Sequence, residues 1–350
     1  MRAIIITHPG GPEVLAIQER PLPEPGPSEV RVRVLVAGLN RADIMQRQGQ
    51  YPAPPCAPRD IPGLEVMGVV DALGPGATVW QKGHRVFGQV GGGGYAEFVT
   101  THERLLAPVP DSLSDIEAGA VPETFMTAHD ALFTQAGLVL GERVLIHAVG
   151  SGFTQPGRVM GERVLVHTVG SGVSTAAMQL AKAIGCTTYG TARSPEKLEK
   201  LESAQAMGLD VALLQPDFVT AIREATSGAG VNVIVDFVGG TYFGQNLKVL
   251  APQGRLVQVG TLAGSWAEIN LDLVMRKRLR IIGTVLRSRP LEEKIAVTRR
   301  FAEQVVPLLE RGAVRPVVDR VFGFEQAAEA QAYMGSNGSL GNILLRIGTP

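Results

Sequence analysis

The sequence of 350 residues has few cysteines and no excess of charge of either sign. Its only cysteines, Cys56 and Cys186, exclude a disulfide framework, and two thiols so far apart are typical of a reducing cytoplasm. A single disulfide between them is the less favoured alternative. Lys and Arg together number 33, as do Asp and Glu, so nothing indicates a general affinity for nucleic acid or anionic membranes.

Long apolar runs are also missing. No segment approaches the roughly 20 apolar residues that span a membrane. Near the start, a run of three isoleucines is cut off by His8 and Pro9, which makes it too short for the core of a signal peptide. We therefore expect a cytoplasmic protein, and the length allows two domains.

The first third of the chain contains short strand-like runs separated by glycine and proline. Residues 29–36 alternate polar and apolar side chains, which is the period of a half-buried strand. Short strands with tight turns predict an all-β module, such as a partly open barrel.

The middle third alternates continuous apolar strands with helical patterns. This βα repetition predicts a parallel sheet that is covered on both faces. The last part returns to strands around one long helix. The expected fold is α/β, with a nucleotide-type domain at 124–289 inserted into a β-rich domain at 1–123 and 290–350.

A tandem duplication lies inside the predicted nucleotide-binding domain. Residues 133–152 and 153–172 are identical at fifteen of twenty positions, and both copies end in Val-Gly-Ser-Gly. A pyrophosphate is held where a strand, a glycine-rich turn and a helix N-terminus follow one another, because free N–H groups and the helix dipole face the anion. The question is which copy has this context.

Only the second copy leads into a helix. Its strand at 163–169 is followed by a turn and by a helical pattern from Ser174, whereas Pro156 and Gly157 follow the first copy and exclude a helix there. We expect 143–152 to be displaced from the central sheet. The predicted cofactor turn consists of Gly170, Ser171, Gly172 and Val173.

The end of the next strand indicates which nicotinamide cofactor binds. Enzymes that use NAD place an acidic residue there for the ribose 2′-hydroxyl. Here the strand ends in Arg193 and Ser194, and Lys197 lies one turn into the next helix. This cluster favours a 2′-phosphate, and therefore NADPH over NADH. The alternative is that these are solvated residues at a helix start.

Six motifs now carry a family resemblance over nearly the whole chain. The chain resembles the zinc-independent medium-chain dehydrogenase/reductases, specifically the NADPH:quinone oxidoreductase branch and its p53-inducible quinone-oxidoreductase-like group. The resemblance implies a GroES-like β-barrel catalytic domain with an inserted Rossmann domain. The motifs are GLNRADIMQRQGQYP (38–52), PGLEVMGVV (62–70), AVPETFMTAHDAL (120–132), GSGVSTAAMQLAK (170–182), NVIVDFVGG (232–240) and GTVLRSR (283–289).

The same resemblance indicates chemistry without a metal. Zinc-dependent members carry Cys where this chain has Asn40, and Gly-His-Glu where it has Gly63, Leu64 and Glu65. Two cysteines cannot build the structural cluster of four that such members often add. Without a Lewis acid, the expected reaction is hydride transfer to an electron-poor acceptor such as a quinone or an activated alkene.

By resemblance, Asn40 and Tyr51 line the substrate pocket, where Tyr51 donates its phenol hydrogen to a quinone oxygen. Two alternatives stay open: Tyr51 as a packing aromatic beside prolines, and Asn40 as a turn residue that satisfies local backbone. Ser171 falls where the family has a Ser that faces the nicotinamide. Further cofactor contacts are implied for Ser174, Gly239, Gly260, Leu286 and Ser288.

The chain departs from the family pattern at three positions besides the duplication. Ser174 replaces a Gly, so it either weakens the turn or caps the helix with its hydroxyl. Leu214 stands near where relatives often have a Tyr beside the 2′-phosphate, and His84 replaces a usual acid.

The sequence thus predicts an NADPH-dependent quinone reductase that acts on small molecules as a homodimer. The alternatives are an enone or enal double-bond reductase, and a nucleotide-binding protein with little catalytic activity.

Overall fold

The computed structural model describes residues 1–138, 162–168, 170–192, 208–214 and 217–348. The chain divides into two compact units, each described below by itself. The first unit consists of Met1–Ala128, Gly170–Ala176 and Val285–Pro350, and the second consists of His129–Val169 and Ala177–Thr284. The domain limits expected after residues 123 and 289 stay a prediction. The strand of the first repeat copy, 143–152, lies outside the described residues.

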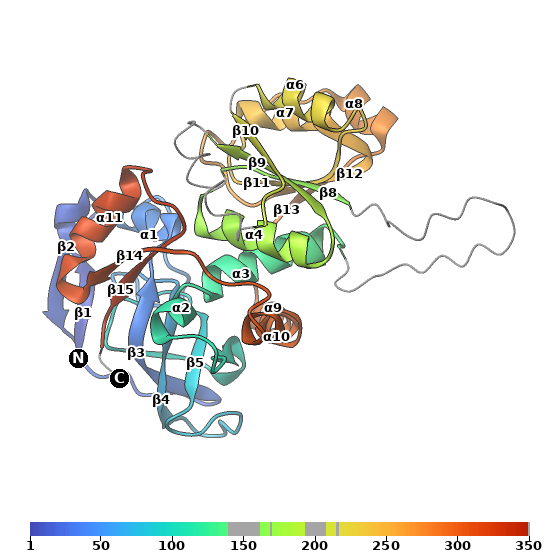
Figure 1. Cartoon of the computed structure of the whole chain (residues 1–350). Helices are drawn as coiled ribbons and strands as arrows, with labels where there is room; N and C mark the ends of the chain where they lie inside the picture. The colour runs from blue at the N-terminus through green and yellow to red at the C-terminus, as the bar shows by residue number, and fades with distance from the viewer. Residues whose placement is uncertain (139–161, 169, 193–207, 215–216, 349–350) are drawn as a thin grey trace, which may run out of the picture. The chain divides into compact units, whose positions relative to one another are not determined.

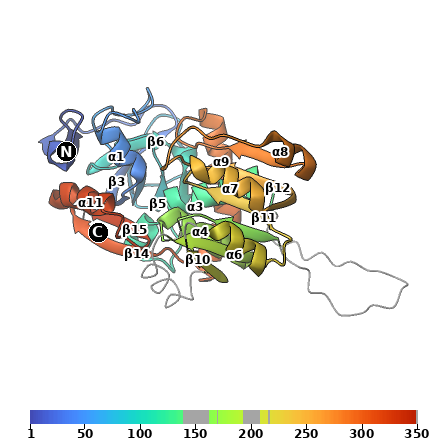
Figure 2. The ribbon, with the colours of Figure 1, turned by 90° about the horizontal axis from the view of Figure 1, so that it is seen from above.

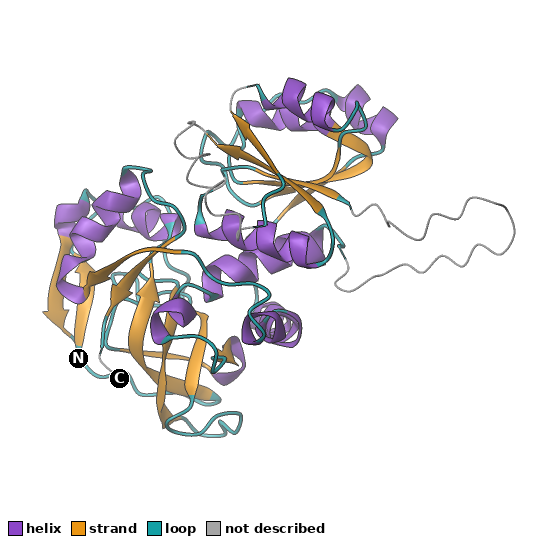
Figure 3. Ribbon diagram, viewed as in Figure 1, coloured by secondary structure: helices purple, strands orange, loops and turns teal. Residues whose placement is uncertain are grey.

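The first unit is built on a sheet in the order β14-β15-β3-β4-β5-β7, with β6 also paired to β3 and a separate β1-β2 pair. Figure 3 draws the strands in orange. Its described strands are β1 (Arg2–Ile6), β2 (Leu15–Glu19), β3 (Glu29–Gly38), β4 (Glu65–Leu73), β5 (Arg85–Gln89), β6 (Phe98–His102), β7 (Leu106–Pro108), β14 (Val318–Gly323) and β15 (Asn342–Arg346). Its helices are η1 (Pro12–Val14), α1 (Arg41–Arg47), η2 (Glu103–Leu105), α2 (Asp115–Gly119), α3 (Pro122–His129), α9 (Leu291–Gln304), α10 (Val306–Glu310), η5 (Phe324–Gln326) and α11 (Ala327–Gly335).

Along the long strand β3, the alternation of partly exposed and buried side chains gives way to continuous burial. Val30, Val32 and Val34 point into the core, and each fully buried side chain stabilises the fold by roughly 1.5–3 kcal/mol. Beyond Val34 both faces are buried, because α2 covers the second face and Gly119 lies close against Val36. A Cβ on Gly119 would be 2.3 Å from Val36 Cγ1.

The second unit contains a parallel sheet in the order β10-β9-β8-β11-β12-β13. Its described strands are β8 (Arg163–Val166), β9 (Thr187–Ala192), β10 (Val211–Leu214), β11 (Val231–Asp236), β12 (Leu250–Gln258) and β13 (Arg280–Gly283). Its helical segments are η3 (Asp130–Gln135), α4 (Gly172–Ala183), α6 (Phe218–Ala225), α7 (Thr241–Val249) and α8 (Leu271–Lys277), with the start of α4 in the first unit.

Helices cover both faces of this parallel sheet. In Figure 1, α6, α7 and α8 lie over one face and α4 lies on the other. Figure 2 shows α6, α7 and α8 in a row, in agreement with the contacts of α7 to both neighbours. No helix in the described part of the chain is long and apolar enough to cross a membrane.

The second repeat copy supplies the inner strand of the sheet, as expected. β8 is hydrogen-bonded to β9 on one side and to β11 on the other. Two boundaries were wrong. The strand ends at Val166 rather than at residue 169, because Thr168 turns into the left-handed region with φ 57°. The helix begins at Gly172 rather than at Ser174, because a side chain before it already caps its first turn.

Candidate active site

Asn40 links the start of helix α1 to strand β4. Its backbone N–H donates to Asp43 Oδ2 at 2.8 Å, so at this turn the side chain of Asp43 satisfies the backbone of Asn40. Its side-chain amide also donates to Glu65 Oε1 at 2.9 Å, which joins residues 25 apart in sequence. The side chain of Asn40 is thus directed at β4, and its place in a substrate pocket stays a prediction.

Glu65 is a buried carboxyl group at the start of β4, and 1% of it is exposed. Besides the amide of Asn40, it accepts the backbone N–H of Glu123 at 2.8 Å. Burial raises the pKa of Glu65 to about 8, and the nearby charge of Glu123 adds to the effect. The group therefore keeps its proton near neutral pH.

Two further acids have raised pKa values close by. Loss of hydration raises the pKa of Glu123 to about 7, although Gln89 Nε2 donates to its carboxylate at 2.6 Å. Burial also raises the pKa of Asp43 to about 6, against hydrogen bonds from the backbone of Gly63 and from the hydroxyl of Tyr95. In the described residues, no group of three or more His, Cys, Asp or Glu is arranged to hold a metal ion.

Tyr51 follows helix α1 and packs against Arg287. The Arg287 guanidinium lies over the phenol ring, with 5.0 Å from Cζ to the ring centroid. It is held there by donating to Gln46 Oε1 at 2.7 Å and to the carbonyl of Gly91 at 2.9 Å. Burial raises the pKa of Tyr51, while Arg287 opposes the rise, so the phenol is a protonated donor at neutral pH.

The predicted cofactor turn is tied to the C-terminal strand region of the first unit. Gly170 has φ 111°, a conformation that favours glycine, and its carbonyl accepts the N–H of Gly341 at 2.7 Å. A Cβ on Gly172 would lie 2.1 Å from Asn342 Oδ1 and 2.7 Å from Thr124 Cγ2. Gly172 is therefore required by packing within the protein, apart from any contact with a cofactor.

Ser171 and Ser174 form the cap of helix α4. Ser171 Oγ accepts the backbone N–H of Ser174 at 3.2 Å, and the two hydroxyl oxygens are 2.7 Å apart. The capping residue is thus Ser171, so of the two alternatives considered for Ser174 the structure does not support the helix cap. Ser174 is fully buried, and its hydroxyl is accommodated by pairing with Ser171. Between them, Val173 is partly exposed.

Gly239 and Gly260 follow the carboxyl ends of β11 and β12. Gly239 has φ 66°, and a Cβ there would be 2.8 Å from the carbonyl oxygen of Gly264. A Cβ on Gly260 would be 3.1 Å from the carbonyl oxygen of Phe237. These glycines allow the two loops to approach each other, which is a structural requirement that the sequence does not reveal.

The other expected cofactor residues are only partly described. Leu286 is buried and Ser288 is exposed, one on each side of Arg287 in the chain. Leu214 ends β10, where its backbone is in register with Ala192. The basic cluster predicted to select NADPH lies outside the described residues; it comprises Arg193, Ser194 and Lys197.

A buried polar network at the carboxyl end of the parallel sheet was not anticipated. Asn246 donates to Asp236 Oδ2 at 3.0 Å, so its oxygen must accept from His167 Nε2, which is 2.7 Å away. His167 Nδ1 then accepts the hydroxyl hydrogen of Thr191 at 3.0 Å. Burial lowers the pKa of this histidine. Asp236 in turn accepts the N–H of Gly239, so the network supports that loop.

The sequence did contain a signal for the missed acids. Glu65 interrupts an apolar run between Leu64 and Val66, both of which are buried. A carboxyl group in a buried strand needs hydrogen-bond partners. Only the structure shows that Asn40 and Glu123 supply them.

Comparisons with known proteins agree with this architecture. Residues 26–111 match the family model described as alcohol dehydrogenase GroES-like domain, and residues 172–304 match the one described as zinc-binding dehydrogenase. Quinone oxidoreductase of Rattus norvegicus is 31% identical over 348 residues, which cover 99% of this chain and 97% of the relative. Synaptic vesicle membrane protein VAT-1 homolog-like of Mus musculus is 29% identical over 365 residues, which cover 99% of this chain and 81% of the relative.

Solved structures resemble the chain over almost its whole length. An NAD-dependent alcohol dehydrogenase has a TM-score of 0.82 at 32% identity, covering 99% of this chain and 100% of that one. The CurK enoyl reductase has a TM-score of 0.82 at 26% identity, covering 99% of each chain. A mycobacterial protein complexed with NADPH has a TM-score of 0.80 at 26% identity, covering 99% of this chain and 100% of that one. The expected α/β fold, a GroES-like domain with an inserted Rossmann domain, is confirmed.

Proposed function

The chain belongs to the medium-chain dehydrogenase/reductase family, and we propose that within it the protein is an NADPH-dependent reductase that transfers hydride to a quinone without zinc. The observation that carries the proposal is the hydrogen bond from the Asn40 amide to Glu65. Asn40 stands where zinc-dependent members have a Cys, so an amide that is hydrogen-bonded to Glu65 takes the place of a metal ligand.

Two side chains support the zinc-independent chemistry. The Asn40 amide nitrogen is a donor without a free lone pair, and it is already directed at Glu65. Leu64 is 4% exposed and has no atom that could bind a metal, at the position where zinc-dependent members have a His. Turnover is expected to survive prolonged chelation. If chelation abolishes turnover and zinc restores it, this part of the proposal fails.

Tyr51 is the proposed proton donor to the quinone oxygen. The reduced nicotinamide, when bound, supplies the hydride. Negative charge then develops on the quinone oxygen, and the phenol of Tyr51 donates a hydrogen bond and then its proton there. Arg287 over the ring stabilises the phenolate that results.

The turn from Gly170 to Ser174 fits a dinucleotide, because it combines a left-handed glycine with the first turn of a twelve-residue helix. The preference for NADPH rests on Arg193, Ser194 and Lys197. The test is titration with both cofactors. Arg193→Asp should reduce the preference for NADPH, while Arg299→Asp on the exposed face of α9 should not change it. Equal affinity of the unaltered protein for both cofactors would remove this assignment.

The main alternative is an enone or enal double-bond reductase, which the similarity to the CurK enoyl reductase favours. The protein is assayed by NADPH oxidation against a panel of 1,2-quinones, 1,4-quinones and enones. Turnover of quinones alone supports the proposal, and turnover of enones alone supports the alternative. Dinucleotide binding without turnover of any acceptor would support a nucleotide-binding protein with little activity.

We also propose a homodimer formed along β13. In the described sheet, β13 has a neighbour on one side only, and apolar side chains near it are exposed. Trp266 is 91% exposed, Met275 70% and Ile281 41%. An open edge with exposed apolar residues favours pairing with a second copy. Sedimentation should show a dimer that Ile281→Lys converts to monomers.

Two free thiols, one of them on the exposed Cys56, accord with the cytoplasm as the proposed location.

A further inference from the structure

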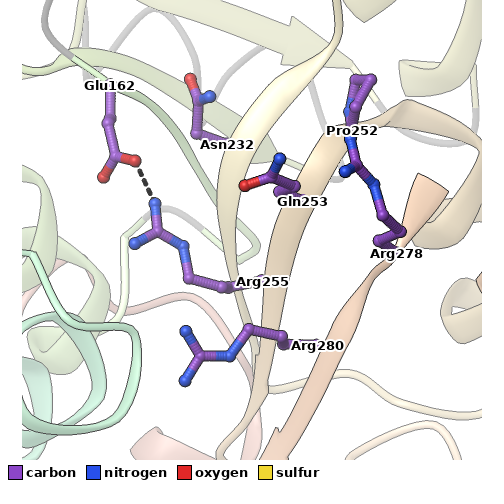
Figure 4. A pocket seen from close by; sticks show the side chains of 7 residues that line it. All are labelled: Glu162, Asn232, Pro252, Gln253, Arg255, Arg278 and Arg280. Atoms are coloured by element: carbon purple, nitrogen blue, oxygen red, sulfur yellow. Dashed lines mark hydrogen bonds and ion pairs between the residues drawn. The ribbon is translucent and has the colours of Figure 1, made fainter.

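A cavity of about 570 Å³ lies in the second unit at the amino ends of four neighbouring strands (Figure 4). Glu162 immediately precedes β8, Asn232 lies in β11, Arg255 in β12 and Arg280 at the start of β13. In parallel sheets, dinucleotides bind at the opposite, carboxyl ends of the strands. The cavity is therefore separate from the proposed cofactor turn.

Arg255 and Arg280 place two positive charges side by side on one wall of this cavity. The two residues are paired in register on β12 and β13, so their side chains project from the same face of the sheet. Figure 4 shows both guanidinium groups extending in the same direction. Like charges directly opposite each other on neighbouring strands are destabilising, so this pair calls for a negative partner.

Only part of that positive charge is balanced by the described residues. Glu162 pairs with Arg255, whose Nη1 also donates to the carbonyl of Ala136 at 2.7 Å. Arg255 Nε is buried without a hydrogen-bond partner in the described residues. Arg278 and Arg280 line the cavity and form no ion pair within the described ranges. Among the described residues that line the cavity, three guanidinium groups against one carboxylate leave two positive charges.

The remaining wall offers amide groups. Asn232 Oδ1 accepts the N–H of Arg163 at 2.8 Å, which leaves the NH₂ group of Asn232 to donate. Gln253 also lines the cavity, from a backbone with φ 62°. Guanidinium groups bind phosphate through paired hydrogen bonds, and a phosphate monoester carries close to two negative charges at neutral pH. The charge and the donors both match such a group.

We propose that this cavity binds a phosphate-bearing small molecule at a site distinct from the dinucleotide site. Arg280 and Arg255, whose guanidinium groups extend in the same direction, hold the phosphate oxygens, Arg278 adds positive charge from another part of the wall, and the amides orient the ligand. The cavity has the size of ordinary small-molecule sites, so it accommodates more than the phosphate itself.

Calorimetric titration of the full-length protein with inorganic phosphate and with glycerol 3-phosphate tests the proposal. Titrations are run at constant ionic strength against chloride, with and without NADPH, so that phosphate bound in the dinucleotide site is recognised by its displacement. Both probes should bind in the presence of NADPH, the monoester at least as tightly as phosphate. The double variant Arg278→Gln with Arg280→Gln should bind at least about tenfold more weakly.

Two further variants separate binding from folding. Arg276→Gln alters a neighbouring exposed residue on α8 that pairs with Asp272, so it should bind as the unaltered protein does. Arg280→Glu places a carboxylate beside Arg255, so it should lose the phosphate response while its melting temperature without phosphate is kept or raised. Equal binding by the unaltered protein and the double Gln variant would overturn the proposal. So would binding of inorganic phosphate but not of the monoester, or no binding beyond chloride. None of these readouts depends on turnover, so they stand apart from the proposed reductase activity.

Discussion

The guanidinium of Arg287 lies over the ring of Tyr51, with 5.0 Å between Cζ and the ring centroid, across 236 residues of sequence. This relationship places a fixed positive charge beside the proposed proton donor. It also explains how a phenol can tolerate negative charge in a half-buried position.

Replacing Arg287 with Met removes this charge and keeps most of the side-chain bulk. We expect kcat for quinone reduction to fall about tenfold or more, because Tyr51 loses the charge that stabilises its phenolate. The alkaline limb of the pH–rate profile should move to higher pH, because Arg287 opposes the rise in the pKa of Tyr51. Steady-state kinetics extended to about pH 11.5 would measure both effects, because the alkaline limb set by Tyr51 lies above pH 10.

The variant Tyr51→Phe provides the comparison for Arg287. If Arg287 acts through Tyr51, the double variant should be little worse than Tyr51→Phe alone. Additive losses in kcat would contradict that role. The exposed variant Arg299→Met is the control for loss of a positive charge elsewhere in the first unit.

Glu65→Gln should flatten the dependence of stability on pH. The pKa of Glu65 is about 8 in the folded protein against an ordinary value of 4.5, so the folded state holds more protons between these values. The free energy of unfolding therefore decreases as pH rises from about 4.5 to 8, by at most about 1.4 kcal/mol per pH unit for this group. Denaturant unfolding from pH 5 to 8.5 should show a smaller slope in the variant.

Glu97→Gln is the matched control for that experiment. Arg2 holds the pKa of Glu97 below its usual value through hydrogen bonds and charge, against a rise caused by partial burial. Its contribution is present above the ordinary pKa and is lost only at more acidic pH. The slope between pH 5 and 8.5 should therefore be unchanged. An unaltered slope in Glu65→Gln would contradict the buried, protonated state of Glu65.

Two deletions of equal length should differ in stability. Removing residues 133–152 joins Leu132 to the second copy and places Pro156 at the site of Ala136. The N–H of Ala136 donates to the carbonyl of Ala131 at 3.0 Å, and proline has no N–H to replace it. The same deletion puts Arg158 where Leu138 is 6% exposed.

Deletion of residues 139–158 keeps Ala136 and Leu138 and also removes twenty residues, which is the length of one repeat copy. We expect this variant to fold and to bind the dinucleotide. The 133–152 deletion should be less stable by about 1–3 kcal/mol, because it loses a buried hydrogen bond and buries a charged residue. Chemical denaturation of both proteins would measure the difference, and equal stability would contradict these contacts.

Gly172→Asp should abolish dinucleotide binding, because a carboxylate would stand at the helix N-terminus where the pyrophosphate is proposed to lie. Gly172→Ala separates charge from packing. Its Cβ would meet Asn342 and Thr124, so we expect the free energy of unfolding to fall by about 1–3 kcal/mol while some binding is kept.

Gly152→Asp, at the corresponding position of the first copy, is the control for this series. It should leave binding nearly intact in titrations with the dinucleotide. If Gly152→Asp abolishes binding while Gly172→Asp does not, the first copy forms the cofactor turn and the assignment made here is wrong.

The sequence by itself determined the elements whose signals are local. The alternation of polar and apolar residues from Glu29 onward predicted β3. The continuity of strand, turn and helix indicated that the second repeat copy forms the inner strand, which is β8. Both inferences depend on neighbours in the chain, where side-chain period and helix capping act directly. The family resemblance named Asn40 and Tyr51 because they lie in continuous motifs.

Only the tertiary structure decided which side chains face one another. The amide of Asn40 finds Glu65 because β4 is positioned beside the start of α1, and Arg287 finds Tyr51 from the far end of the chain. In the second unit, Arg255 and Arg280 become neighbours through the register of β12 and β13. Hydrogen bonds and charge repulsion act over a few ångströms in space, and no period in the sequence encodes which distant residues the fold brings within that range.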